Sequence, residues 1–283
     1  MINRTRIALA AFAMATLTAS PALAQGPSVA RTIFDGDYVI VGLGASLSPS
    51  YEGSNDYTVF PVPVVAGRIA GVGITPRSSG IALDFIKDPQ DAKISFQLGP
   101  VFSLRFDRHG KTHDPVVETL GRRDIAVEIG GNAGFSINRI TNGYDSLTFS
   151  VDVKKDVAGA HDGVIISPNI SYITPLSKGA LLAINASADH VDSKYASYYY
   201  SVTPSESIAS GLPVYNAQSG WKDAQIGILG ALDLDGDLTN GGFSVFVAGN
   251  YERLLGNFER APVVDIRGSP NQWTGAVGVA YVF

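Results

Sequence analysis

The chain has 283 residues, of which 45% are hydrophobic and 17% are charged, with a formal net charge of −5 and no cysteine. The lack of cysteine excludes disulfides, thiolate metal sites and cysteine nucleophiles, and the mild acidity argues against nucleic acid as a partner. The abundance of glycine, tyrosine and phenylalanine, with 31, 12 and 13 residues, favours strands and turns over helices.

The first 24 residues have the pattern of a secretory signal peptide. Arg4 and Arg6 precede an apolar run from Ile7 to Leu17, and Ala22-Leu23-Ala24 then offers the small-x-small pattern that a signal peptidase cuts. No later apolar run approaches the roughly 20 residues of a membrane helix, so a membrane-spanning domain would have to be a closed barrel. We predict a signal peptide at 1–24, a periplasmic lead at 25–36 and a barrel at 37–283.

The first four predicted strands are short or interrupted. Residues 37–47 alternate apolar side chains with glycines and form the first strand. The second, 57–65, contains Pro61 and Pro63, and we expect it to be distorted, partly unpaired or locally looped because proline cannot donate to a ladder. The glycine-punctuated segments 68–75 and 80–86 are predicted as the third and fourth strands, joined by a turn at 76–79.

Eight further segments alternate between apolar and small or polar residues. They are 93–107, 124–137, 146–154, 163–174, 180–191, 223–234, 243–252 and 272–283. Charges lie only on the face opposite the apolar one, which alternation places in the lumen of a barrel whose apolar side meets lipid. The predicted lumen charges are Arg105, Glu128, Asp152, Lys154, Asp223 and Glu252.

The pattern predicts an all-β fold, a transmembrane antiparallel up-and-down β-barrel of 12 strands. Ten strands remain possible if the third and fourth form a plug or a hairpin. The long connections 48–56, 108–123, 192–221 and 256–271 all follow odd-numbered strands, whereas 138–143, 175–179 and 235–240 are short and follow even-numbered ones. Short periplasmic turns and longer external loops alternate in this way in bacterial outer-membrane barrels.

The chain ends on a strand whose last alternate residues are Tyr281 and Phe283. A terminal aromatic is the usual assembly signal of outer-membrane barrels, so we assign this role to Tyr281 and Phe283 and expect the barrel-assembly machinery as a partner. In the last strand Trp273 and Tyr281 bracket an apolar middle, and their separation projects to roughly 20 Å, near the height between aromatic girdles. Outer-membrane lipid and lipopolysaccharide would surround such a barrel.

No catalytic, cofactor or metal site is predicted. His109 and His113 have a zinc-compatible spacing, but Gly110 and Pro115 disfavour the helix that this spacing requires. His161 lies beside Asp162, yet no nucleophile signature accompanies the pair. The tyrosines at 195 and 198–200 fit a ligand-stacking surface, an interface belt or packing within a loop. The lumen charges fit either a narrow pore or a closed polar core.

Several short motifs together resemble the MipA/OmpV family of outer-membrane proteins, over nearly the whole mature chain. They are Pro49-Ser-Tyr-Glu-Gly-Ser54, Pro61-Val-Pro63, Gly99-Pro100, Ser210-Gly-Leu-Pro-Val-Tyr-Asn-Ala-Gln-Ser-Gly220, Tyr251-Glu-Arg-Leu-Leu-Gly256, Ser269-Pro-Asn-Gln272 and Tyr281-Val-Phe283. The sequence departs from the family at Tyr199-Tyr-Ser-Val202, where Phe-Gly usually follows the first aromatic. The resemblance implies a barrel in the outer membrane of a Gram-negative cell, without enzymatic activity or cofactor.

The resemblance also implies partners. The founding member is described as a scaffold for a membrane-bound lytic transglycosylase and a murein synthase, and other members are associated with adhesion, osmotic response or uptake of small solutes. We therefore expect a scaffold for peptidoglycan-remodelling enzymes, contacted through the lead before Asp37 and the three short turns. A narrow channel for small solutes and a surface adhesin acting through the 192–221 loop are the alternatives.

Overall fold

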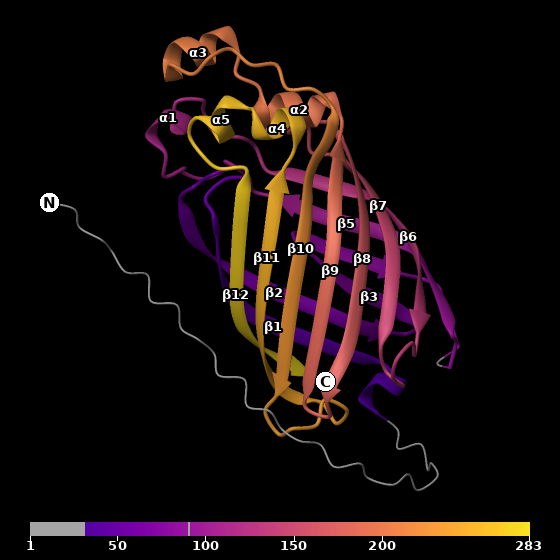
Figure 1. Cartoon of the computed structure of the whole chain (residues 1–283). Coiled ribbons are helices and arrows are strands. Elements are labelled where there is room, and N and C mark those ends of the chain that lie inside the picture. Colours follow the sequence, from indigo (N-terminus) through magenta and orange to yellow (C-terminus); the bar gives the residue numbers. More distant parts are fainter. Residues whose placement is uncertain (1–31, 90) are drawn as a thin grey trace, which may run out of the picture. The chain divides into compact units, whose positions relative to one another are not determined.

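The computed structural model describes residues 32–89 and 91–283, whose strands form one closed antiparallel barrel (Figure 1). The predicted signal peptide and most of the predicted lead lie outside the described residues. Each strand pairs with its neighbours in sequence, and β1 pairs with β12 to close the wall. The strands are β1 Tyr38–Pro49, β2 Tyr57–Ile69, β3 Val72–Arg77, β4 Gly80–Asp84, β5 Ile94–Arg105, β6 Ala126–Asn138, β7 Ser146–Asp156, β8 Val164–Ser177, β9 Ala180–Val191, β10 Gly220–Asp233, β11 Gly242–Leu254 and β12 Asn271–Val282.

The predicted count of twelve strands is confirmed, and the ten-strand alternative is wrong because β3 and β4 are part of the wall. The predicted boundary between the second and third strands is wrong. β2 continues to Ile69, and the turn falls at Ala70 and Gly71, with φ of 52° and 83°. Gly67 keeps β2 close to β1, because a Cβ there would lie 2.3 Å from the carbonyl oxygen of Tyr38.

The outer face of the barrel is apolar and the inner face is mostly polar, as strand alternation predicts. Leu43, Trp273 and Val277 are among the outward residues, with 62%, 61% and 58% of their surface exposed. Inward positions of the same strands carry glycine, serine, threonine and glutamine. A continuous belt of exposed apolar side chains in a closed barrel is the surface that a bilayer covers.

The two ends of the barrel differ. The end that we call the loop end carries the connections 50–56, 78–79, 106–125, 157–163, 192–219 and 255–270, which follow odd-numbered strands. The opposite turn end carries 70–71, 85–93, 139–145, 178–179 and 234–241, together with the 3-10 helix η1 Ile33–Asp35. The three longest connections, 106–125, 192–219 and 255–270, are at the loop end as predicted. The fourth predicted long connection is reduced to 50–56 and is shorter than 85–93 and 234–241 at the turn end.

Within residues 32–89 and 91–283, five α-helices are found, and all lie at the loop end (Figure 1). They are α1 Pro115–Glu118, α2 Ser193–Tyr200, α3 Pro204–Ser210, α4 Gly256–Glu259 and α5 Pro262–Asp265. Proline at the first turn of α1, α3 and α5 suits the start of a helix, where its missing N–H has no partner to lose. Across the described ranges, the longest and most apolar helix still falls short of what crossing a membrane requires.

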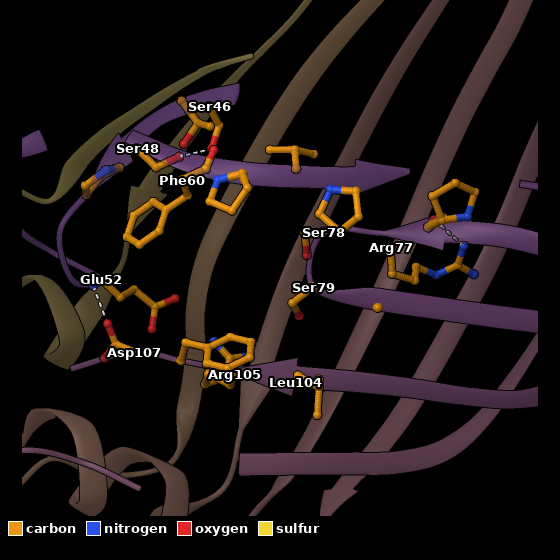
Figure 2. A pocket seen from close by; sticks show the side chains of 18 of the residues that line it. Ser46, Ser48, Glu52, Phe60, Arg77, Ser78, Ser79, Leu104, Arg105 and Asp107 are labelled. Carbon is orange, nitrogen blue, oxygen red and sulfur yellow. Dashed lines mark hydrogen bonds between the residues drawn. The ribbon is translucent and has the colours of Figure 1, made fainter. Parts of the chain in front are cut away.

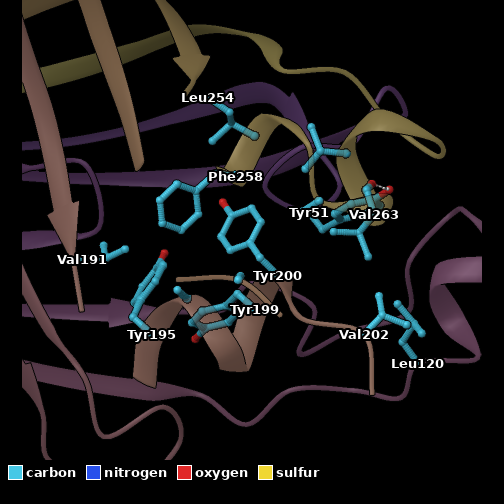
Figure 3. Close-up of a cluster of buried hydrophobic side chains, with 14 of the residues drawn as sticks. Tyr51, Leu120, Val191, Tyr195, Tyr199, Tyr200, Val202, Leu254, Phe258 and Val263 are labelled. Atoms are coloured by element: carbon cyan, nitrogen blue, oxygen red, sulfur yellow. Dashed lines mark hydrogen bonds between the residues drawn. The ribbon is translucent and has the colours of Figure 1, made fainter. Parts of the chain in front are cut away.

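The main apolar core of the described chain lies among these loops rather than inside the barrel (Figure 3). Tyr195, Tyr199 and Tyr200 of α2 are at most 2% exposed and pack against Phe258 of α4 and Leu254 at the end of β11. The Tyr200 and Phe258 rings meet edge to face, with centroids 5.1 Å apart. The tyrosine run of the long loop therefore packs within the loops, and the loops form a cap with its own hydrophobic core.

Candidate functional site

Beneath the cap, charged side chains from many strands meet in a buried layer. Glu128 of β6, which is 0% exposed, accepts hydrogen bonds from Arg105 Nε at 2.8 Å and Ser103 Oγ at 2.7 Å. Lys154 of β7 lies 3.1 Å from the same carboxylate, and His161 Nε2 lies 3.5 Å from it. A buried carboxylate needs such partners, because removing it from water without them costs several kcal/mol.

A second part of the layer surrounds Lys222, which is 1% exposed. Its ammonium group contacts Glu52 of the 50–56 loop and lies 2.8 Å from Asp223 and 3.6 Å from Asp189. A register shift between Trp221 and Asp223 explains how two consecutive residues, Lys222 and Asp223, are both buried. Such a bulge adds one residue and re-aims a side chain that strict alternation would turn outward.

Glu52 joins the cap to the charged layer. Its Oε2 accepts hydrogen bonds from the hydroxyls of Tyr195 at 3.0 Å and Tyr200 at 2.8 Å, while its Oε1 contacts Lys222. Burial acts to raise the pKa of this carboxyl, but the Lys222 ammonium and the Arg105 guanidinium outweigh it and lower the pKa to about 2. Glu52 is therefore ionised, and it is held between the cap and the charged layer.

Further ion pairs link strands of the wall to one another and loops of the cap to one another. Arg77 of β3 donates from Nε to Asp152 of β7 at 2.7 Å, across the lumen. Asp114 caps α1 through the backbone N–H groups of Val116 and Val117, and it also accepts from Arg267 at 2.6 Å. The Arg267 hydrogen bond and these backbone bonds lower the pKa of Asp114 although partial burial opposes them. The Asp114–Arg267 ion pair therefore joins the 106–125 and 255–270 loops.

Three carboxylates could in principle hold a cation. Glu52, Asp223 and Glu252 each place one oxygen within 4.8 Å of the others. The Lys222 ammonium already contacts Glu52 and Asp223, so a protein cation serves two of the three carboxylates. The four histidines do not contribute to this group: the sequence prediction of no histidine metal site stays untested, and His161 instead packs edge to face on Tyr195 with centroids 5.0 Å apart.

A cavity of about 840 Å³ opens beside this layer (Figure 2). Its polar lining includes Ser46 and Ser48 of β1, Glu52, Arg105 and Glu252. Its apolar lining includes Phe60 and the prolines of β2, Ile81 of β4 and Leu104 of β5. The turn at Ser78 and Ser79 forms one edge of the cavity, with β2 and the end of β5 on either side of it (Figure 2).

All six predicted lumen charges lie inside the barrel. Arg105, Glu128 and Lys154 form one cluster, Asp152 pairs with Arg77, and Asp223 pairs with Lys222. Glu252 lines the cavity, and its Oε1 is buried without a hydrogen-bond partner among the described residues. The sequence prediction missed Glu52, Arg77, Lys222, Asp189 and His161. Glu52 and His161 reach the layer through loop folding and Lys222 through a bulge, whereas Arg77 and Asp189 belong to β3 and β9.

The predicted assembly residues lie at the turn end. Tyr281 packs against Phe243 and Phe283, with ring centroids 4.7 Å and 4.6 Å away, and Phe283 is 65% exposed. The backbone N–H of Phe283 donates to the carbonyl of Val39 at 2.9 Å. The final aromatic is thus held at the β1–β12 closure with its ring available at the surface.

The chain matches the model of a family described as MltA-interacting protein MipA over residues 41–283. Among solved structures it is similar to the COG4313 outer membrane channel from Pseudomonas putida F1, at 10% identity and a TM-score of 0.43, covering 92% of this chain and 100% of that one. It is also similar to the outer membrane channel DcaP of Acinetobacter baumannii, at 10% identity and a TM-score of 0.31, covering 88% and 96%. No curated protein matches this chain.

Proposed function

This chain belongs to the MipA family and is an outer-membrane β-barrel, and from that premise we propose that it is a non-enzymatic scaffold for a murein-remodelling enzyme. The family is described by its interaction with MltA, which makes a lytic transglycosylase the first partner to test and a murein synthase the second. The loop end then faces outward and the turn end faces the periplasm. The scaffold surface is the turn end.

The observation that supports this proposal is the connection of the turns into one surface. The η1 helix is tied to the 234–241 turn, because Ile33 N–H donates to Thr239 carbonyl at 2.9 Å. The 234–241 connection also contacts the 178–179 turn, because the N–H of Leu238 donates to the carbonyl of Lys178 at 2.8 Å. Short turns that are joined in this way present more area than any single turn offers, toward the roughly 800 Å² per partner of a standard interface.

A second cluster extends the same end. The carboxylate of Asp145 accepts from Thr141 Oγ1 at 2.6 Å and from Tyr172 Oη at 2.8 Å, which holds the 139–145 turn against β8. Lys93 Nζ donates to the Arg139 carbonyl at 2.6 Å and links this turn to the end of the 85–93 connection. The hydrogen bonds to Asp145 lower its pKa although burial opposes them. These bonds give the periplasmic turns a fixed arrangement, which a docking surface requires.

The cap at the loop end favours the scaffold over an open pore. Its packed aromatic core and the buried ion pairs beneath it fill the outer mouth with side chains. A porin instead keeps an aqueous channel there. The surface-adhesin alternative has support in Ile208 and Val214 of the 192–219 loop, which are 88% and 58% exposed, but scattered apolar residues are normal on a surface.

The test is capture of a purified lytic transglycosylase by the refolded barrel, with Asp235→Lys as the interface variant. Asp235 is exposed in the 234–241 turn, and charge reversal at an interface edge should slow association and weaken capture about tenfold at low salt. The matched control is Asp265→Lys on α5, which is also exposed but lies at the loop end. Equal capture by both variants and the unaltered chain would contradict the scaffold.

A further inference from the structure

The wall of the barrel is incomplete beside β2, toward the loop end. β2 pairs with β1 from Tyr57 to Arg68, but it pairs with β3 only at Gly67, Arg68 and Ile69. Across the ranges that the structure describes, no strand is paired with residues 57–66 on the other side. Pro61 and Pro63 lie in this stretch and have no N–H that a missing neighbour would leave unsatisfied.

The cavity passes through this part of the wall. Its lining includes the consecutive residues Phe60, Pro61, Val62 and Pro63 of β2, and also Leu104 and Arg105 of β5. Consecutive strand residues point to opposite faces of a sheet. A cavity that is lined by residues of both faces therefore reaches the lumen as well as the lipid-facing surface. Its volume of about 840 Å³ lies within the roughly 300–1,000 Å³ of small-molecule sites.

The two ends of the cavity differ in chemistry. At the membrane side, the rim is apolar: Val65, Leu104 and Phe106 are 41%, 46% and 57% exposed. Phe60 continues this apolar surface inward, since it is on the lumen face of β2 yet remains 43% exposed. The inner end carries Glu252, Gln272 and Thr274 from β11 and β12. Such a gradient matches a molecule with an apolar chain and a polar head.

Glu252 identifies the kind of head group. The other ionisable residues that line the cavity all have partners: Arg77 with Asp152, Arg105 with Glu128, Glu52 with Lys222, and Asp107 with the backbone N–H of Glu52. In the described chain, Glu252 Oε1 is buried and accepts no hydrogen bond. A buried acceptor without a partner costs about 1–3 kcal/mol, which a ligand that donates a hydrogen bond would recover.

We propose that this cavity is a lateral binding site for a single-chain amphiphile with an amine head. The apolar chain lies between β2 and the Ser78-Ser79 turn and extends into the outer leaflet, while the ammonium donates to Glu252. Glu52 and Asp223 lie close to Glu252, and Lys222 is their common cation. The excess of carboxylates over ammonium groups at this point favours a positive head over a negative one.

The experiment uses dodecylamine as the probe and dodecanoate as the probe of equal chain length and opposite charge. The chain has no cysteine, so Ser78→Cys provides one site for an environment-sensitive fluorophore at the edge of the cavity. The labelled barrel is placed in lipid nanodiscs at pH 7 and titrated with each probe. Leu232→Cys, on the lipid-facing side of β10 and 56% exposed there, carries the same label and reports partition into the bilayer alone.

We expect a saturable response to dodecylamine at Ser78→Cys, a linear one at Leu232→Cys, and a weaker response to dodecanoate. Adding Glu252→Gln should raise the Kd for dodecylamine about tenfold, the loss expected for a hydrogen bond to a charged group. Leu104→Trp, which fills the apolar rim, should weaken the binding of both probes. Heat-shifted gel mobility shows which variants are folded.

Linear responses at both label positions, or saturation that is equal for the two probes, would overturn the proposal. The two labelled barrels are sufficient for that test without Glu252→Gln or Leu104→Trp. The turn-end capture experiment is independent, because Ser78, Leu104 and Glu252 all lie toward the loop end, and Leu232, near the turn end, carries only the control label.

Discussion

Glu52 connects the two parts of the loop end. Tyr195 and Tyr200 of the cap donate to one of its oxygens, and Lys222 of the wall contacts the other. Burial opposes its ionisation, yet the neighbouring cations lower its pKa from 4.5 to about 2. At this site the free energy of folding depends on the ionised carboxylate, since only that form pairs with Lys222.

The sign of the pH dependence follows from the direction of this shift. The pKa of Glu52 is lower in the folded chain than in the unfolded chain. Its contribution to the free energy of unfolding is therefore present above pH 4.5 and is lost as the pH falls toward 2. At about 1.4 kcal/mol per pKa unit, the loss is on the order of a few kcal/mol. We expect the urea midpoint of unfolding in lipid vesicles to fall between pH 6 and pH 3, and to fall less steeply for Glu52→Gln.

Asp265→Asn is the control for this measurement, because Asp265 is exposed on α5 and makes no ion pair among those found in the described chain. The variant should retain the pH slope of the unaltered barrel. Identical slopes for Glu52→Gln and the unaltered barrel would show that the carboxylate of Glu52 contributes nothing to the acid sensitivity.

Among the connections, the 192–219 loop contributes the largest number of residues to the cap core. Its helix α2 contributes Tyr195, Ala196, Tyr199 and Tyr200 to the cap core, whereas α3 in the same loop has no buried residue. The 192–219 loop therefore contains one helix, α2, that packs in the cap core and another, α3, that lies on the surface of the cap. This difference allows the seal to be tested without changing the strands.

Replacing residues 193–219 by a short glycine-serine linker should open the lumen. Without the tyrosines of α2, water replaces the core above the charged layer, and single-channel conductance in a planar bilayer should rise at least severalfold. The matched control replaces only Pro204–Ser210 with glycine-serine residues, which removes α3 and leaves the core in place. A rise in the control as large as in the full replacement would mean that the cap core is not the seal.

At the scale of the whole molecule, closure depends on the pairing of the two ends of the chain. β12 pairs with β1 from Val282 opposite Ile40 to Gly275 opposite Leu47, and Phe283 adds a backbone bond to Val39. The Phe283 ring contacts Tyr281 and is otherwise 65% exposed. It therefore contributes little packing, which is consistent with a role in recognition during assembly.

We predict that Phe283→Ala slows assembly in cells without changing the finished barrel. The rate at which newly made protein becomes heat-modifiable should fall severalfold. The free energy of unfolding, measured in urea after refolding into vesicles, should stay within about 0.5 kcal/mol of that of the unaltered barrel, as for other exposed positions. Leu234→Ala is the control, because Leu234 is also at the turn end and is 66% exposed. Equal assembly rates for the two variants would exclude the signal.

Side-chain alternation was sufficient to predict the class of fold and the faces on which charges lie, whereas the choice between ten and twelve strands required the pairing of β3 and β4 with their neighbours. A strand has a period of two residues, and a bilayer requires an apolar outer face on every strand, so the local pattern in β5, β6, β7, β11 and β12 is sufficient to identify both. The lengths of the connections are also local, and they predict which end of the barrel faces outward. The position of Arg105, Glu128 and Asp152 inside the lumen followed from the same rule.

The arrangement of the loops and the opening in the wall could not be predicted from local sequence patterns, because both depend on contacts between distant segments. Glu52 is 170 residues from Lys222 along the chain, and no local pattern pairs two residues at that separation. The bulge at Lys222 depends on the register with β9, and the opening beside β2 depends on how far β3 extends along it. Alternation describes each strand by itself, whereas the cap, the charged layer and the cavity arise from contacts between distant segments.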